Sequence, residues 1–196
     1  MTAGAATTYG LGTARPNGWW GMVIFVAGET TLFLMLFASY FYLRLQSDHW
    51  PPPGVPKPAV LVPVLLTAAL LATSFAMQRA WRAGRTLTRG AAWRWLAAAG
   101  VVQAGYLVWQ IHDFVDLCRT EPPSHSAYAS IHLTLLALDH AHVLIGALLT
   151  TWLVARLSTR ITPYRLRLLQ AVTFYWHAVN TITVAVLLVS LSPYIA

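Results

Sequence analysis

Residues 19–43 read WWGMVIFVAGETTLFLMLFASYFYL, and this stretch decides the class of fold. Its only charged side chain is that of Glu29. A helix needs roughly 20 mostly apolar residues to cross the hydrocarbon core of a bilayer, and the stretch meets this length. The apolar residues do not alternate with polar ones, as the strands of a membrane barrel require. We therefore expect a membrane-spanning helix here.

Further apolar runs follow and have the same character. They cover approximately residues 59–82, 91–115, 126–155 and 168–191. Proline, which removes a backbone donor and clashes with the preceding helical turn, marks the connecting segments 46–58, 120–124 and 162–163. The sequence therefore predicts an all-α integral membrane protein. Its one domain, residues 19–196, is a bundle of five transmembrane helices, and residues 1–18 form a separate N-terminal segment.

The composition excludes several other classes of protein. The chain is 57% hydrophobic and 10% charged, whereas soluble domains are roughly 25% charged. The formal net charge is +7, but the basic residues lie in gaps between apolar runs rather than on the water-facing patch that a nucleic-acid binder needs. The single cysteine, Cys118, excludes an internal disulfide, a multi-cysteine metal site and a CxxCH haem attachment.

Arginine is concentrated around two of the four connections between the apolar runs. These arginines are Arg79, Arg82, Arg85, Arg89 and Arg94 at one connection, and Arg156, Arg160, Arg165 and Arg167 at the other. The other two connections hold only Arg44, Lys57 and Arg119. Cytoplasmic loops carry an excess of Lys and Arg. We therefore expect both arginine-rich connections and residues 1–18 to be cytoplasmic, and the C-terminus to be outside.

Polar side chains recur at a similar depth in three of the expected helices. Glu29 lies about 15 Å from the cytoplasmic end of the first, at 1.5 Å per residue. The others are Asp139, His140 and His142 in the fourth run, and His177 and Asn180 in the fifth. Asp139 and His142 are three residues apart and share a helix face, whereas His140 faces elsewhere. Ionisable residues inside a membrane helix are costly and indicate a functional site.

Three interpretations of this polar layer are open. The side chains satisfy one another across helix interfaces, as membrane helices commonly do; or they form a protonatable or lipid-headgroup site; or they bind a metal ion or haem. A metal site would use the carboxylates of Glu29 and Asp139 together with histidines. A haem would need His142 and His177 on facing helices. Near the outer surface, a hydrated interface accounts for His112, Asp113, Asp116 and His132.

Several short segments, taken in order, resemble a known family. They are GETTLF at 28–33, FASYF at 37–41, WPPPGV at 50–55, HVLIG at 142–146 and YWHAVN at 175–180. Together they resemble subunit III of the haem–copper oxidases, most closely the cytochrome c oxidase type. Many members have seven helices, so the chain resembles a short form that lacks the first two. Asn180 stands where the family has aspartate.

The resemblance implies an accessory subunit of a respiratory terminal oxidase in a bacterial plasma membrane. Such a complex reduces oxygen to water with electrons from cytochrome c and moves protons. By resemblance, this chain has no catalytic residues and binds no metal; haem and copper belong to partner subunits. It packs against subunit I, assembles with subunit II, binds structural phospholipid and supports proton uptake. Glu29 corresponds to the family's glutamate, His142 to the nearby histidine, and Arg156 to a basic residue that contacts a lipid phosphate.

Two kinds of alternative stay open. Within the family, the chain is an accessory subunit of a quinol oxidase or a nitric oxide reductase, because other subunits select the electron donor. Outside it, the chain is an independent b-type cytochrome or a small transporter. Because their depths agree to within about one helical turn, we expect Glu29 and His142 to lie within hydrogen-bonding reach, directly or through one water.

Overall fold

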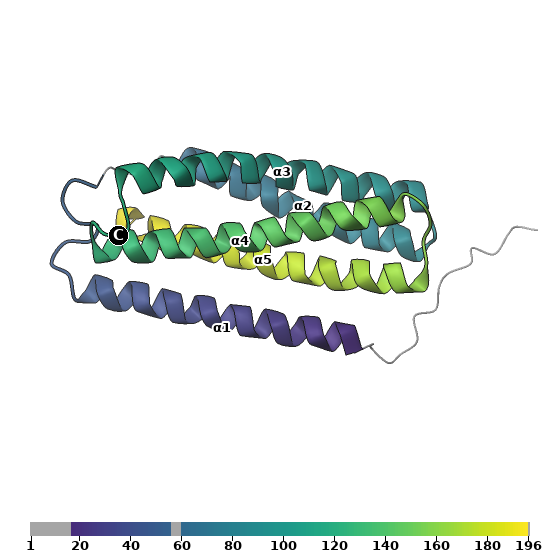
Figure 1. The fold of residues 1–196 in the computed structure, drawn as a ribbon, viewed down its shortest axis with the longest axis horizontal. Coiled ribbons are helices and arrows are strands. Elements are labelled where there is room, and N and C mark those ends of the chain that lie inside the picture. The colour runs from purple at the N-terminus through teal and green to yellow at the C-terminus, as the bar shows by residue number, and fades with distance from the viewer. Residues whose placement is uncertain (1–16, 56–59, 196) are drawn as a thin grey trace, which may run out of the picture.

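The computed structural model describes residues 17–55 and 60–195, and these fold into five long helices (Figure 1). The helices are α1 (Asn17–Leu45), α2 (Leu61–Arg85), α3 (Arg89–Thr120), α4 (Ala127–Leu157) and α5 (Pro163–Ile195). None of the described residues is in a strand. The predicted all-α bundle of five helices is confirmed. Residues 1–16 of the expected N-terminal segment, and Lys57, lie outside the described residues.

Most of the helices extend beyond the apolar runs that predicted them. α3 spans residues 89–120 where 91–115 was expected, and α5 begins at Pro163 instead of residue 168. Hydropathy marks only the part of a helix that lies in apolar surroundings, whereas capping determines where it begins and ends. Proline is favoured at a first helical position, where its missing N–H is not needed. At the start of α4, the Ser126 hydroxyl accepts a hydrogen bond from the Ala129 amide, 3.0 Å away.

Helices α2, α3, α4 and α5 form a closed ring in which each contacts two neighbours. Among the described helices, α1 contacts only α4 and α5, and Figure 1 shows it along the outside of that pair. Phe33 and Tyr40 are the buried residues of α1. Near its end, the Arg44 guanidinium donates a hydrogen bond to the Ser192 hydroxyl of α5 at 3.1 Å. α1 is therefore attached to the ring through a narrow contact.

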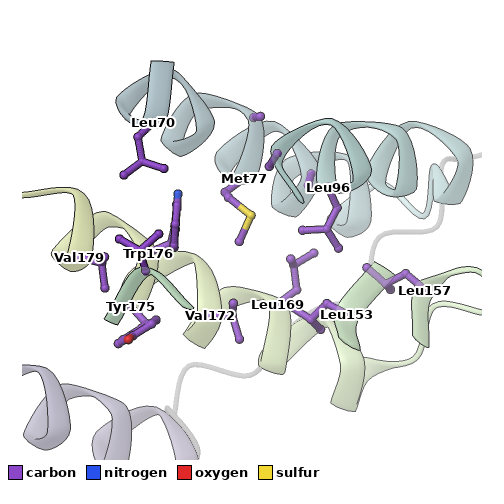
Figure 2. Packing of buried hydrophobic residues seen from close by; sticks show 14 of the residues in the cluster. Leu70, Met77, Leu96, Leu153, Leu157, Leu169, Val172, Tyr175, Trp176 and Val179 are labelled. Atoms are coloured by element: carbon purple, nitrogen blue, oxygen red, sulfur yellow. The ribbon is translucent and has the colours of Figure 1, made fainter. Parts of the chain in front are cut away.

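The ring encloses an apolar core in which Trp176 of α5 is the largest fully buried side chain. Figure 2 shows it among Leu70, Met77 and Val179. Its indole N–H donates a hydrogen bond to Oγ1 of Thr73 on α2, 2.7 Å away. The core is therefore largely apolar, but it contains a buried hydrogen bond that connects α2 to α5.

Four helices, α1, α2, α4 and α5, are long and apolar enough to cross a membrane. α3 is equally long and packs along α2 and α4, but it carries more charged residues than any of these four. Large apolar side chains cover the outer surface; Ile24 is 72% exposed, and Val101 and Val108 are each 73% exposed. Such a surface is suited to lipid or to apolar partner helices rather than to water. The chain is a multi-pass membrane protein.

The two ends of the bundle differ in charge. The arginine end contains the connections at residues 86–88 and 158–162, and the acidic end contains residues 46–55 and the connection at 121–126. In Figure 1 the acidic end is on the left and the arginine end on the right. All six acidic residues of the chain lie either within helices or toward the acidic end. No carboxylate therefore neutralises the arginine end.

Candidate functional site: a polar layer between helices

Glu29 of α1 and His142 of α4 form a hydrogen-bonded pair inside the bundle. Oε2 of Glu29 lies 3.0 Å from Nε2 of His142. The other ring nitrogen, Nδ1, is 2.6 Å from the backbone oxygen of Leu138. A carbonyl oxygen only accepts hydrogen bonds, so Nδ1 is the protonated donor in this contact. Both nitrogens of His142 are therefore used within the chain.

This arrangement allows two positions for one proton. Either the Glu29 carboxyl group donates to a neutral Nε2, or Nε2–H of an imidazolium donates to the carboxylate. Both forms have a net charge of zero, so neither leaves an unpaired charge in apolar surroundings. The Glu29 side chain is 25% exposed and that of His142 is 8% exposed. The pair is chemically suited to hold and exchange a proton, and Glu29 is its more accessible member.

Asp139, which precedes His142 by almost one turn of α4, has a different partner. Its Oδ1 accepts a hydrogen bond from Oγ1 of Thr183 on α5, 2.7 Å away. The residue is 2% exposed. Its second oxygen, Oδ2, has no hydrogen bond to any described residue. The polar layer therefore continues from the α1–α4 contact to the α4–α5 contact, where one carboxylate oxygen is unpaired.

The other predicted polar residues are not brought to Glu29. Asn180 donates hydrogen bonds to the backbone oxygen of Leu70 at 3.3 Å and to the hydroxyl of Ser74, both on α2. The His177 ring is half-buried and makes no hydrogen bond to a described residue. The His140 ring packs edge-on against Phe114, and its Nε2 has no partner in the described part of the chain. The layer is thus a set of separate contacts rather than one cluster.

The geometry does not support the metal or haem interpretation of this layer. Among residues 17–55 and 60–195, no three His, Cys, Asp or Glu side chains lie close enough together to hold a metal ion. The ring nitrogens of His142 are directed at Leu138 and Glu29. Neither nitrogen is therefore directed toward His177 across a space that a haem would fill.

Three hydroxyl groups complete the layer and were not among the residues predicted from the sequence. The Tyr175 hydroxyl donates to the backbone oxygen of His142 at 3.0 Å. The other two belong to Thr73 and Thr183. Tyr175 lies within the YWHAVN segment, which offered a signal for it. The two threonines have no such signal, because a hydroxyl in a membrane helix usually bonds to its own backbone.

Arg156 occupies the last turn of α4 at the arginine end. Its guanidinium carbon lies 5.4 Å from the ring centre of Trp152, a cation–π geometry. It makes no ion pair with a described residue. The neighbouring Arg165 donates to the backbone oxygens of Arg156 and Arg160 and to the Thr159 hydroxyl. The Arg156 guanidinium is thus held near an aromatic ring with its charge uncompensated, which suits an anion such as a phosphate.

Comparisons with known proteins agree in their description. A family model for cytochrome c oxidase subunit III matches residues 8–194. Cytochrome c oxidase subunit 3 of Bacillus subtilis is 28% identical over 171 residues, which cover 86% of this chain and 82% of the relative. The probable cytochrome c oxidase subunit 3 of Mycobacterium leprae is 30% identical, and the match covers 84% of this chain and 82% of the relative. Cytochrome c oxidase subunit 3 of Synechocystis is 25% identical, and the match covers 83% of this chain and 70% of the relative.

Proposed function

Because the chain belongs to the cytochrome c oxidase subunit III family, we propose that it is the non-catalytic accessory subunit of a respiratory terminal oxidase in a bacterial plasma membrane. As a haem–copper oxidase subunit III, it is part of an oxidoreductase complex with other oxidase subunits. Subunit I is the proposed direct partner, with subunit II in the same complex. The haem and copper centres that reduce oxygen belong to those partners.

The observation that carries this proposal is the hydrogen bonding of His142. Both of its ring nitrogens are engaged within the chain, one by Glu29 and one by Leu138. A histidine that served a redox centre would direct one nitrogen at the metal. The buried polar groups of this chain instead join helices. A supporting role in the complex fits these contacts better than a catalytic role.

Support of proton uptake is the proposed role of the Glu29–His142 pair. The pair carries one exchangeable proton with no net charge, and Glu29 is the partly exposed member. Glu29 keeps this exposure although it faces α4, and α4 and α5 are the only helices that contact α1 in the described chain. A proton held here is available to a water or a side chain of the adjoining subunit.

Phospholipid binding is the proposed role of the arginine end. Arg156 supplies a guanidinium that forms bidentate hydrogen bonds to a phosphate, and the adjacent Trp152 ring occupies the interfacial depth. The exposed apolar faces of the helices continue from this point along the bundle. A lipid whose phosphate contacts Arg156 therefore has an apolar surface against which its acyl chains pack.

Affinity purification of the complex tests the function. The chain carries a C-terminal tag, and the membranes are solubilised in a mild detergent. We expect a larger haem-bearing subunit to co-purify, and the preparation to oxidise reduced cytochrome c. Oxidation of a quinol alone would instead favour a quinol oxidase subunit. The same tagged chain expressed without its partners should show no Soret absorbance; a Soret band there would overturn the accessory role.

A further inference from the structure

A cavity of about 430 Å³ lies inside the ring toward the acidic end. Side chains from α2, α3, α4 and α5 line it. Asp139 and Thr183 border its deep end, and Thr120, Glu121 and Tyr194 lie near the helix ends. At 1.5 Å per residue, Asp139 lies about 18 Å along α4 from the acidic end. The cavity therefore extends from the surface to nearly the middle of the bundle.

The lining of this cavity is largely apolar, but it contains most of the chain's carboxyl groups. It includes four of the chain's six acidic residues: Asp113, Asp116, Glu121 and Asp139. No lysine or arginine is among the described residues that line it. His132 also lines the cavity, and its ring stacks on that of Tyr128.

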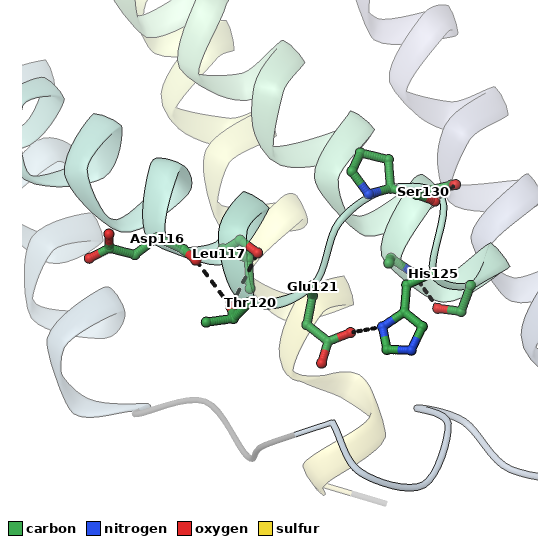
Figure 3. Close-up of polar contacts among 9 residues, drawn as sticks. Asp116, Leu117, Thr120, Glu121, His125 and Ser130 are labelled. Carbon is green, nitrogen blue, oxygen red and sulfur yellow. Dashed lines mark hydrogen bonds and ion pairs between the residues drawn. The ribbon is translucent and has the colours of Figure 1, made fainter.

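Basic groups outside the cavity compensate only part of this charge. His125 is paired with Glu121 at 3.3 Å, as Figure 3 shows, and His112 and Arg119 are paired with Asp116. Asp113 has no ion pair with a described residue, and Asp139 bonds only to the neutral hydroxyl of Thr183. The carboxyl groups of Asp113 and Asp139 therefore have no basic partner among the described residues.

Two polar groups in the cavity require a partner that the described chain does not supply. One is Oδ2 of Asp139, in a residue that is 2% exposed; the other is the Ser190 hydroxyl. Burying such groups without a hydrogen bond is unfavourable. The volume holds several waters at about 30 Å³ each. The rings of Tyr106, Trp109 and Tyr128 also line the space, and aromatic faces attract cations.

We propose that this cavity is filled with water, is open to the aqueous phase at the acidic end, and concentrates small monovalent cations toward Asp139. The carboxylates near the mouth attract positive charge and disfavour anions. The unpaired Oδ2 of Asp139 is the innermost ligand. This function is independent of the accessory role, because it concerns water and ions inside the ring rather than the Glu29–His142 pair.

Charged thiol reagents of similar size test the proposal in the intact oxidase complex. Cys118, the only native cysteine, is first replaced by serine. Leu187→Cys then places a thiol in the cavity wall, one turn from Thr183. Leu188→Cys places a thiol at nearly the same depth on the outer surface, where Leu188 is 58% exposed. The reagents are the trimethylammonium-ethyl and sulfonato-ethyl methanethiosulfonates, and their rates are normalised to free cysteine.

We expect Leu187→Cys to react at least about tenfold faster with the cationic reagent than with the anionic one. Leu188→Cys, facing lipid or an apolar partner, should react slowly with both, since these reagents need water and a thiolate. Reaction at Leu187→Cys no faster than at Leu188→Cys would show that the cavity is closed to water. Equal normalised rates for the two reagents at Leu187→Cys would overturn the preference for cations.

Asp139→Asn tests whether this residue causes the preference for the cationic reagent, because asparagine still accepts the Thr183 hydrogen bond but carries no charge. In the Leu187→Cys background it should lower the ratio of cationic to anionic rates several-fold. Asp48→Asn, at an exposed acidic residue outside the cavity, should leave the ratio unchanged. If Asp139→Asn prevents assembly, Asp113→Asn at the cavity wall should lower the ratio in the same direction. A ratio that neither cavity variant changes would refute the proposal.

Discussion

The indole ring of Trp176 on α5 lies against Gly146 on α4 so closely that a Cβ atom at position 146 would overlap it. Withdrawal of the Trp176 ring would break the hydrogen bond from its N–H to Thr73 on α2. Gly146 thus allows α4 and α5 to approach while α5 stays attached to α2. This contact connects two of the segments, HVLIG and YWHAVN, that also carry the family resemblance.

Gly146→Ala should therefore destabilise the protein, by about 1–3 kcal/mol in the range typical of overpacked cores. Thermal unfolding of the purified complex in detergent is the measurement. Gly105→Ala is a matched control in α3, where a new Cβ meets no atom within 4 Å. That control should be neutral or slightly stabilising, because alanine is the better helix former. Equal melting temperatures for both variants would contradict the close contact at Gly146.

Glu29→Gln and Glu29→Ala should have different effects. Glutamine keeps the shape and donates a hydrogen bond to Nε2 of His142, so assembly and most oxygen reduction should be retained. Alanine leaves the buried histidine nitrogen without a partner, which typically costs about 1–3 kcal/mol. Thermal stability and oxygen consumption of the complex distinguish the two. Loss of all activity in an intact Glu29→Gln complex would instead place Glu29 on an obligatory proton path.

Glu29 should also be the carboxyl group that reacts most readily with a hydrophobic carbodiimide. It is partly exposed, it lies within an apolar helix, and it shares a proton with His142. Peptide mass spectrometry of the treated complex locates the adduct. Asp139, which is 2% exposed within the ring, serves as the internal comparison. Faster labelling of Asp139 than of Glu29 would contradict the assignment of Glu29 as the accessible carboxyl.

Arg156→Ala should lower the amount of phospholipid that stays with the purified complex and leave initial oxygen reduction nearly unchanged. The guanidinium beside Trp152 is the proposed phosphate ligand, and Arg156 lies about 21 Å along α4 from His142, the partner of Glu29. Native mass spectrometry measures the retained lipid. Arg160→Ala is the control, because Arg160 is an exposed arginine at the same end with no aromatic contact among the described residues. Unchanged lipid retention in Arg156→Ala would exclude this site.

The arginine end should face the cytoplasm. In a Cys118→Ser background, Arg85→Cys should resist a membrane-impermeant thiol reagent added to intact cells, whereas Asp48→Cys at the acidic end should react. Both positions are exposed, so burial does not explain a difference. Labelling in opened vesicles confirms that both thiols are reactive. The reverse pattern in intact cells would invert the predicted orientation.

Depth along a helix was predictable from the sequence, and this is why Glu29 and His142 could be proposed as partners. Rotation about the helix axis and the order of helices in the ring were not. Asn180 lies at a similar depth, yet it faces α2 and bonds to Ser74. Asp139 meets a threonine on α5 rather than a histidine. Such partners follow from tertiary packing, to which the hydropathy of a single segment is insensitive.

The cavity could not be predicted from the sequence either, for a related reason. Asp113, Asp116 and His132 were assigned to a hydrated interface because each lies near a helix end. That they line one cavity with Asp139 depends on how α3 and α4 are turned relative to each other. The helix ends were imprecise as well, since α3 continues to Thr120 through polar residues that a hydropathy pattern excludes.

Because α1 is attached to the ring through a narrow contact, few interactions determine its position along the ring. Apolar contacts are non-directional, so a helix held only by them can shift along its axis with little change in energy. α1 is instead held by two hydrogen bonds, from Glu29 to α4 and from Arg44 to α5. The two hydrogen bonds are about 22 Å apart at 1.5 Å per residue. A displacement or rotation of α1 by one residue would break both hydrogen bonds at once. The two hydrogen bonds therefore select a single axial register for a helix that apolar contacts alone would not fix.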